Sequence, residues 1–120
     1  MDKTWKAVER RGAKLFGTRR NPLSGINSGV TGSDTRHEKF YFEFKHGAST
    51  RISPNKLLEL MVDTETKAAG ENKTPIVVLH KKFSREMDCY LRYKDLVNLV
   101  NGYGEGMLVR VSADDLAKIV

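Results

Sequence analysis

The chain has 120 residues, of which 39% are apolar, and this length fits one domain with a single modest core. We therefore expect one domain over residues 1–120. The 21 lysines and arginines outnumber the 15 aspartates and glutamates, which gives a formal charge of +6 and a pI near 9.6. This charge is compatible with an anionic partner such as a nucleic acid, although proteins that bind nothing acidic can also be basic.

The single cysteine, Cys89, excludes an intrachain disulfide and a cysteine-based zinc site. In a strand it is expected to be a small buried hydrophobe. The first residues lack the apolar core of a secretory signal, and the longest aliphatic run, residues 76–79, is too short to span a bilayer. These features predict a soluble, intracellular and cytoplasmic protein with no membrane partner.

Residues 3–16 predict a helix, because Trp5 and Phe16 belong to an apolar side at helical spacing while basic residues occupy the other side. Gly17 is a suitable stop. The following stretch, Thr18–Gly32, is rich in glycine, asparagine and serine and therefore predicts a long loop. A loop of this length in a compact domain is usually functional or disordered.

A strict alternation over residues 40–46 predicts a strand with three phenylalanines on one face and Tyr41, Glu43 and Lys45 on the other. The phenylalanine face is expected to be core, although such a stripe can also stack bases. We predict a partner strand over residues 30–35, joined to it through a polar turn at residues 36–39.

The order of predicted elements indicates an α/β or α+β domain with helices packed on a central mixed sheet. Ser53 and Pro54 form a good helix start, and β-branched residues favour a strand buried on both faces. The later predicted elements are a helix from Pro54 to near Gly70, strands over 76–79 and 88–93, and short helices over 96–100 and 116–120.

Two acids and a lysine make up the main chemical pattern. Glu43 and Lys45 share one strand face, and Asp34 precedes Glu43 by nine residues at the end of the predicted partner strand. Two carboxylates and a strand carbonyl can hold Mg²⁺ or Mn²⁺ and leave positions for water and phosphate. A nearby lysine can orient or deprotonate the attacking water, or stabilise the phosphate. Alone the pattern is weak, since Glu and Lys often share a solvent face.

Glu9 lies at the margin of the apolar side of the first helix. A carboxylate there is costly unless it is paired or metal-bound. Two interpretations stay open at this point. Glu9 either faces the sheet as a further metal ligand or pairs with a neighbouring lysine or arginine.

The Glu9-Arg10 pair, a basic serine-containing loop, Asp34 and the Glu43-Phe44-Lys45 strand together resemble the archaeal-type Holliday junction resolvases. These belong to the PD-(D/E)XK nuclease superfamily and also occur in viruses, in which case the host cytoplasm is the expected setting. The resemblance covers mainly residues 5–46. It implies an α/β restriction-endonuclease-like fold with a central mixed β-sheet flanked by helices.

The resemblance also implies an activity and a site. The expected enzyme is a Mg²⁺-dependent endonuclease, with Mn²⁺ able to substitute, that resolves four-way DNA junctions as a homodimer. A serine before the aspartate also matters in the family, and the candidates are Ser24 and Ser33. The aspartate here follows a serine instead of the usual proline or aliphatic residue. By position, the implied catalytic residues are Glu9, Asp34, Glu43 and Lys45, of which Glu9, Asp34 and Glu43 are metal ligands.

Residues 1–20 hold seven basic and two acidic residues, a net charge of +5. This positive charge lies beside the predicted metal ligands, which favours contact with the phosphates of DNA. The alternative is a basic face that only meets solvent. A second basic turn at residues 81–85 is at least as well explained by solvation. The candidate DNA-binding residues are Arg10, Arg11, Lys14, Arg19, Arg20 and Ser24.

Two rival functions stay open. One is a PD-(D/E)XK nuclease that acts on other DNA, as repair or restriction enzymes do. The other is a non-catalytic nucleic-acid-binding module whose acids and lysine are only a polar sheet face. His37, His46 and His80 lack zinc-site spacing and are expected at the surface or in support of the site.

Overall fold

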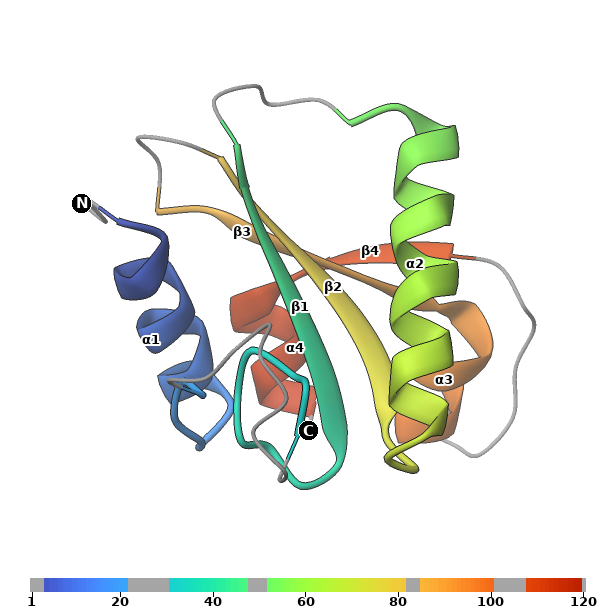
Figure 1. Ribbon diagram of the computed structural model, residues 1–120, viewed down its shortest axis with the longest axis horizontal. Helices are drawn as coiled ribbons and strands as arrows, with labels where there is room; N and C mark the ends of the chain where they lie inside the picture. The colour runs from blue at the N-terminus through green and yellow to red at the C-terminus, as the bar shows by residue number, and fades with distance from the viewer. Residues whose placement is uncertain (1–3, 22–30, 48–51, 82–84, 101–107, 120) are drawn as a thin grey trace.

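The computed structural model describes residues 4–21, 31–47, 52–81, 85–100 and 108–119. The predicted α/β arrangement is confirmed: a four-stranded mixed sheet, in the order β1-β2-β3-β4, is flanked by helices (Figure 1). Strands β1 and β2 are parallel, and the other two pairs are antiparallel. In chain order the elements are α1 (Trp5–Leu15), β1 (Phe40–Gly47), α2 (Pro54–Ala69), β2 (Thr74–Lys81), β3 (Met87–Arg92), α3 (Tyr93–Val100), β4 (Leu108–Ser112) and α4 (Ala113–Ile119).

The helix ends follow their local sequence. The Thr4 hydroxyl caps the start of α1, and α1 ends before Gly17, whose φ of 70° is a conformation that glycine adopts readily. The Ser53 hydroxyl accepts the backbone N–H of Lys56 at 3.1 Å, so α2 begins at the predicted cap and ends before Gly70.

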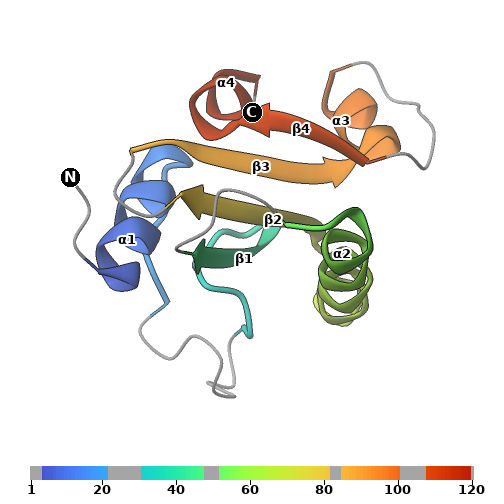
Figure 2. The same ribbon diagram turned by 90° about the horizontal axis from the view of Figure 1, so that it is seen from above.

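The core lies on the phenylalanine face of the sheet, as predicted. The register places Phe42 beside Ile76 and Phe44 beside Val78. Helices α1 and α4 cover this face, while α2 packs on the opposite side of β1 and β2 (Figures 1 and 2). The residues of β2 from Ile76 to Val78 are therefore buried from both sides.

The predicted hairpin before β1 is wrong. Residues 31–35 form bends and a single isolated bridge between Arg20 and Thr35, not a strand. In the described part of the chain the only strand that pairs with β1 is β2, so β1 lies at the edge of the sheet. The side chains of Ser33 and Asp34 bond the backbone of β1 at Phe42 and Phe44, in place of the regular ladder of a hairpin. Strand β4 was not predicted at all.

Candidate active site

The outer edge of β1, which pairs with no other described strand, is covered by side chains of the segment that precedes it. The backbone N–H of Asp34 also donates to the carbonyl of Phe42 at 2.9 Å, which draws this segment against the strand. The outward N–H groups of β1 donate to three side chains: Phe40 to His37 Nδ1 at 3.1 Å, Phe42 to Ser33 Oγ at 2.8 Å and Phe44 to Asp34 Oδ2 at 2.6 Å. Asp34 is thereby fixed beside the strand that carries Glu43 and Lys45.

Two residues that the sequence did not single out support this segment from behind. Asn21, which is 1% exposed, donates through its side chain to the carbonyls of Thr31 and Ser33 at 3.1 and 3.0 Å. The carboxylate of Glu71 accepts the backbone N–H of Gly32 at 2.9 Å. The sequence gave no signal of these supporting roles, because Asn21 stands alone in a loop and Glu71 simply follows a helix.

Asp34 is buried, and its electrostatics reflect this. The residue is 6% exposed, and burial raises the pKa of its carboxyl to about 7. The Phe44 N–H opposes this rise, the charges of Glu43 and Glu9 add to it, and Lys45 opposes it. The carboxyl of Asp34 therefore keeps its proton to a higher pH than an ordinary aspartate does.

Glu43 and Lys45 point to the same face of β1, as predicted from the alternation. Lys45 Nζ lies 3.4 Å from Glu43 Oε1, and the lysine side chain is 48% exposed. The amine is therefore available to an approaching phosphate or water, while the Glu43 carboxylate adds its negative charge to the field at Asp34.

Glu9 is engaged by an arginine. Its side chain is buried, and Arg20 Nε donates to Glu9 Oε1 at 2.8 Å. Burial raises the pKa of Glu9, and Arg20 counteracts part of that rise. The structure contains the ion pair, one of the two interpretations that the sequence left open. The other, a role for Glu9 as a metal ligand, stays a prediction.

The donor chemistry of Asp34 and Glu43 fits a hard divalent cation. Both supply carboxylate oxygens, their charges repel one another, and a bound cation would relieve this repulsion. Mg²⁺ commonly uses one or two protein carboxylates and keeps several waters. Among the described residues no three acidic, histidine or cysteine side chains are gathered closely enough to hold a metal.

The predicted DNA-binding residues divide into several groups. Arg10, Arg19 and Arg20 line a hollow of about 390 Å³ together with Arg36, which sequence reasoning had assigned to a polar turn. Arg11 instead donates to the carbonyl of Arg85 at 2.7 Å. Lys14 is an exposed residue in the last turn of α1, and Ser24 lies outside the described residues.

Trp5 lies on the predicted apolar side of the first helix but is not buried. It is 48% exposed, and the Arg20 guanidinium lies 5.0 Å from the centre of the indole ring. Trp5 and Glu9 therefore hold Arg20 between them, by a cation–π contact and an ion pair. Ser33, one of the two candidate serines, is fully buried and bonds the backbone of β1.

His80, which was expected either at the surface or in support of the site, is buried. It is 3% exposed, and its Nδ1 lies 2.6 Å from Nδ1 of His46 on the neighbouring strand. Cys89 is buried in the core as predicted. Burial raises the pKa of its thiol to about 12, which makes it a poor nucleophile.

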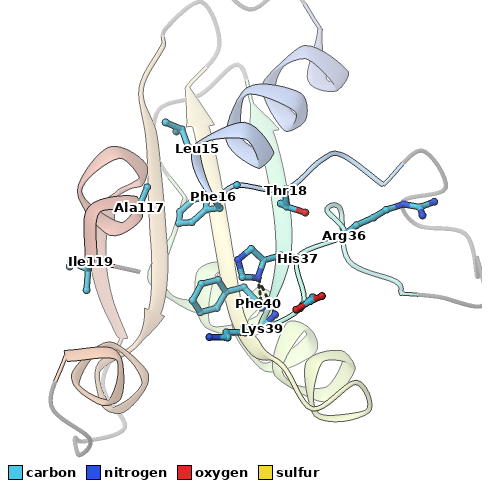
Figure 3. Close-up of a pocket in the computed structure, with 11 residues that line it drawn as sticks. Leu15, Phe16, Thr18, Arg36, His37, Lys39, Phe40, Ala117 and Ile119 are labelled. Carbon is cyan, nitrogen blue, oxygen red and sulfur yellow. Dashed lines mark hydrogen bonds between the residues drawn. The ribbon is translucent and has the colours of Figure 1, made fainter.

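A further hollow of about 740 Å³ lies at the start of β1, lined in part by Phe16, His37, Phe40 and Ala117 (Figure 3). The His37 ring stacks on Phe40, and burial, then Lys73 and Lys39, lower the pKa of His37. None of the predicted catalytic residues lines this hollow. It is therefore separate from the cluster at Asp34.

No helix within the described ranges is long and apolar enough to cross a membrane. In comparisons with known proteins, the chain matches no family model, and no curated protein or solved structure matches it significantly.

Proposed function

We propose that this chain is a metal-dependent DNA endonuclease of the PD-(D/E)XK superfamily, with a restriction-endonuclease-like version of its α/β fold. The observation that carries the proposal is the anchoring of Asp34 to the main chain of β1 at Phe44, next to Glu43 and Lys45. This places two carboxylates and an amine together at the edge of a mixed sheet.

The proposed chemistry is hydrolysis of a phosphodiester. Asp34 and Glu43 would hold Mg²⁺, or Mn²⁺ in its place, and the bound ion would supply a Lewis acid and an acidified water. Asp34 must lose its proton to serve as a ligand. Lys45 lies on the same face and can orient the water, accept its proton or stabilise charge on the phosphate.

The proposed substrate is branched DNA, and specifically the four-way junction. Arg10, Arg19, Arg20 and Arg36 line one hollow and supply positive charge that would attract the phosphate backbone of DNA. Resolution of a junction requires two symmetric cuts, so we propose a homodimer with two sites related by a two-fold axis. Junction preference rests on the resemblance of Glu9-Arg10, Asp34 and residues 43–45 to the resolvases.

The deciding experiment is cleavage of a labelled four-way junction and a duplex of matched sequence, each with Mg²⁺ and with chelator. Wild type is compared with Asp34→Asn and with Asp115→Asn, a matched change at an exposed residue of α4. Paired symmetric nicks in the junction, lost only in Asp34→Asn and with chelator, are expected. Equal cleavage of the duplex would indicate another nuclease of the superfamily, and binding without any cleavage would indicate a non-catalytic module.

A further inference from the structure

Four arginines from three segments of the chain meet at one hollow of about 390 Å³. Arg10 comes from α1, Arg19 and Arg20 follow that helix, and Arg36 precedes β1. The segments are held together by the backbone: Arg36 N–H donates to the carbonyl of Arg19 at 3.0 Å, and Arg20 forms a bridge with Thr35. The convergence is therefore part of the fold.

The charges in this hollow are not balanced. Glu9 neutralises Arg20, but no acidic side chain in the described part of the chain pairs with Arg10, Arg19 or Arg36. Like charges that meet without a counter-charge repel one another, and the repulsion weakens once an anion lies between them. Arg36 also belongs to the lining of the hollow at the start of β1, but in Figure 3 its side chain extends away from His37 and Phe40.

The chemistry of the lining suits a phosphate group better than a nucleic-acid base. Guanidinium groups match phosphate oxygens with two parallel hydrogen bonds, and the described residues that line the hollow are all arginines. Among these lining residues there is no apolar or aromatic wall on which a base could stack. The place of the hollow is also fixed relative to Asp34, because the N–H of Asn21, next to Arg20, donates to the carbonyl of Asp34 at 2.8 Å.

We propose that this hollow binds one backbone phosphate of DNA, other than the phosphate that is cut. The inference rests on the proposed function and deepens it. Arg36 becomes a DNA-binding residue, and the bound phosphate sets the register of the strand relative to Asp34. The hollow acts in binding and positioning, and takes no part in bond cleavage.

The test measures binding in the absence of metal, by fluorescence anisotropy of labelled junction and duplex DNA over a series of salt concentrations. The variants are Arg36→Gln, Arg36→Lys and the control Arg110→Gln, an exposed arginine of β4 at the far edge of the sheet. Arg36→Gln should weaken binding about tenfold and lower the salt slope by about one, as expected for one lost phosphate contact. Arg36→Lys keeps the charge and should lose less affinity.

A second measurement locates the contact. Single phosphates of the DNA are replaced one at a time by neutral methylphosphonates. At one phosphate position, the methylphosphonate should weaken binding by the wild type but not by Arg36→Gln. If Arg36→Gln binds like Arg110→Gln, or if the two losses are additive at every position, the inference is overturned. Because no metal is present, this result is independent of whether the protein cleaves DNA.

Discussion

The carboxylate of Asp34 accepts the backbone N–H of Phe44 through a hydrogen bond of 2.6 Å. Phe44 stands between Glu43 and Lys45, so this bond sets where Asp34 lies relative to both. It also holds the carboxylate in a buried position where the ionised form is disfavoured. Position and protonation of Asp34 are thus linked through one bond.

Asp34→Asn should change how stability depends on pH. The pKa of Asp34 is about 7 in the folded chain and near 3.8 when unfolded. Between these values the folded state binds more protons, so the free energy of unfolding without metal falls as pH rises, by at most about 1.4 kcal/mol per pH unit. Asn cannot ionise and removes this decline. Urea unfolding with chelator across the pH range measures it, with Asp115→Asn keeping the wild-type slope; an unchanged slope in Asp34→Asn would refute the assignment.

Lys45→Gln should abolish most DNA cleavage while it leaves stability nearly unchanged, because the lysine is about half exposed. A lost acid–base or charge-stabilising group typically lowers the rate by about 10²–10⁴-fold. Lys45→Arg keeps the charge but not the proton-transfer chemistry, so its rate separates charge stabilisation from base catalysis. The control is Lys118→Gln, at a lysine 79% exposed on α4. Full activity of Lys45→Gln in single-turnover assays would exclude a catalytic lysine here.

Arg20→Gln should destabilise the protein by about 1–3 kcal/mol, because it leaves the buried Glu9 without its cationic partner. Glu9→Gln should cost less, since the amide oxygen still accepts a hydrogen bond. Thermal unfolding of both single variants and the double variant gives the coupling between them.

The Mg²⁺ dependence of cleavage then separates the two roles considered for Glu9. If Glu9 acts only through its ion pair, Glu9→Gln keeps the wild-type Mg²⁺ requirement. If Glu9 leaves Arg20 to bind the metal, the variant needs more Mg²⁺ for half-maximal cleavage. Arg110→Gln is the reference for a charge change elsewhere.

Gly12→Ala should weaken the contact between α1 and β1. A Cβ atom at Gly12 would lie 2.5 Å from ring atoms of Phe44, so the ring or the helix must move. Overpacking of this kind typically costs about 1–3 kcal/mol. Chemical denaturation measures the loss, with Lys14→Ala as an exposed control in the same helix. Because Phe44 also holds Asp34, cleavage should fall as well; a variant as stable as wild type would show that the packing is looser than described.

Most elements could be predicted because periodicity carries the information locally. The alternation at residues 40–46 and the cap at Ser53 need no tertiary context. Strand β4 is different, because Leu108–Ser112 is five residues long and is stabilised by its pairing with β3. The burial of β4 does not alternate along the strand, so this segment carries no period-two signal of its own.

The candidate site was predictable in part for the same reason. A period of two places Glu43 and Lys45 on one face whatever surrounds the strand. The nearness of Asp34 was expected from a hairpin, whereas side-chain bonds to the edge of β1 bring it there. The place of Arg36 beside Arg10, Arg19 and Arg20 could not be predicted, because it depends on the backbone contact with Arg19.

The covered edge of β1 also bears on how the chain avoids self-assembly. The strand reads Phe-Tyr-Phe-Glu-Phe, a sequence that would readily recruit another extended chain if its outward N–H groups were free. Ser33, Asp34 and His37 occupy those groups. Removing the Asp34 side chain would therefore open a template for intermolecular strand addition as well as a gap in the site, so light scattering should accompany every assay of an alanine variant at this position.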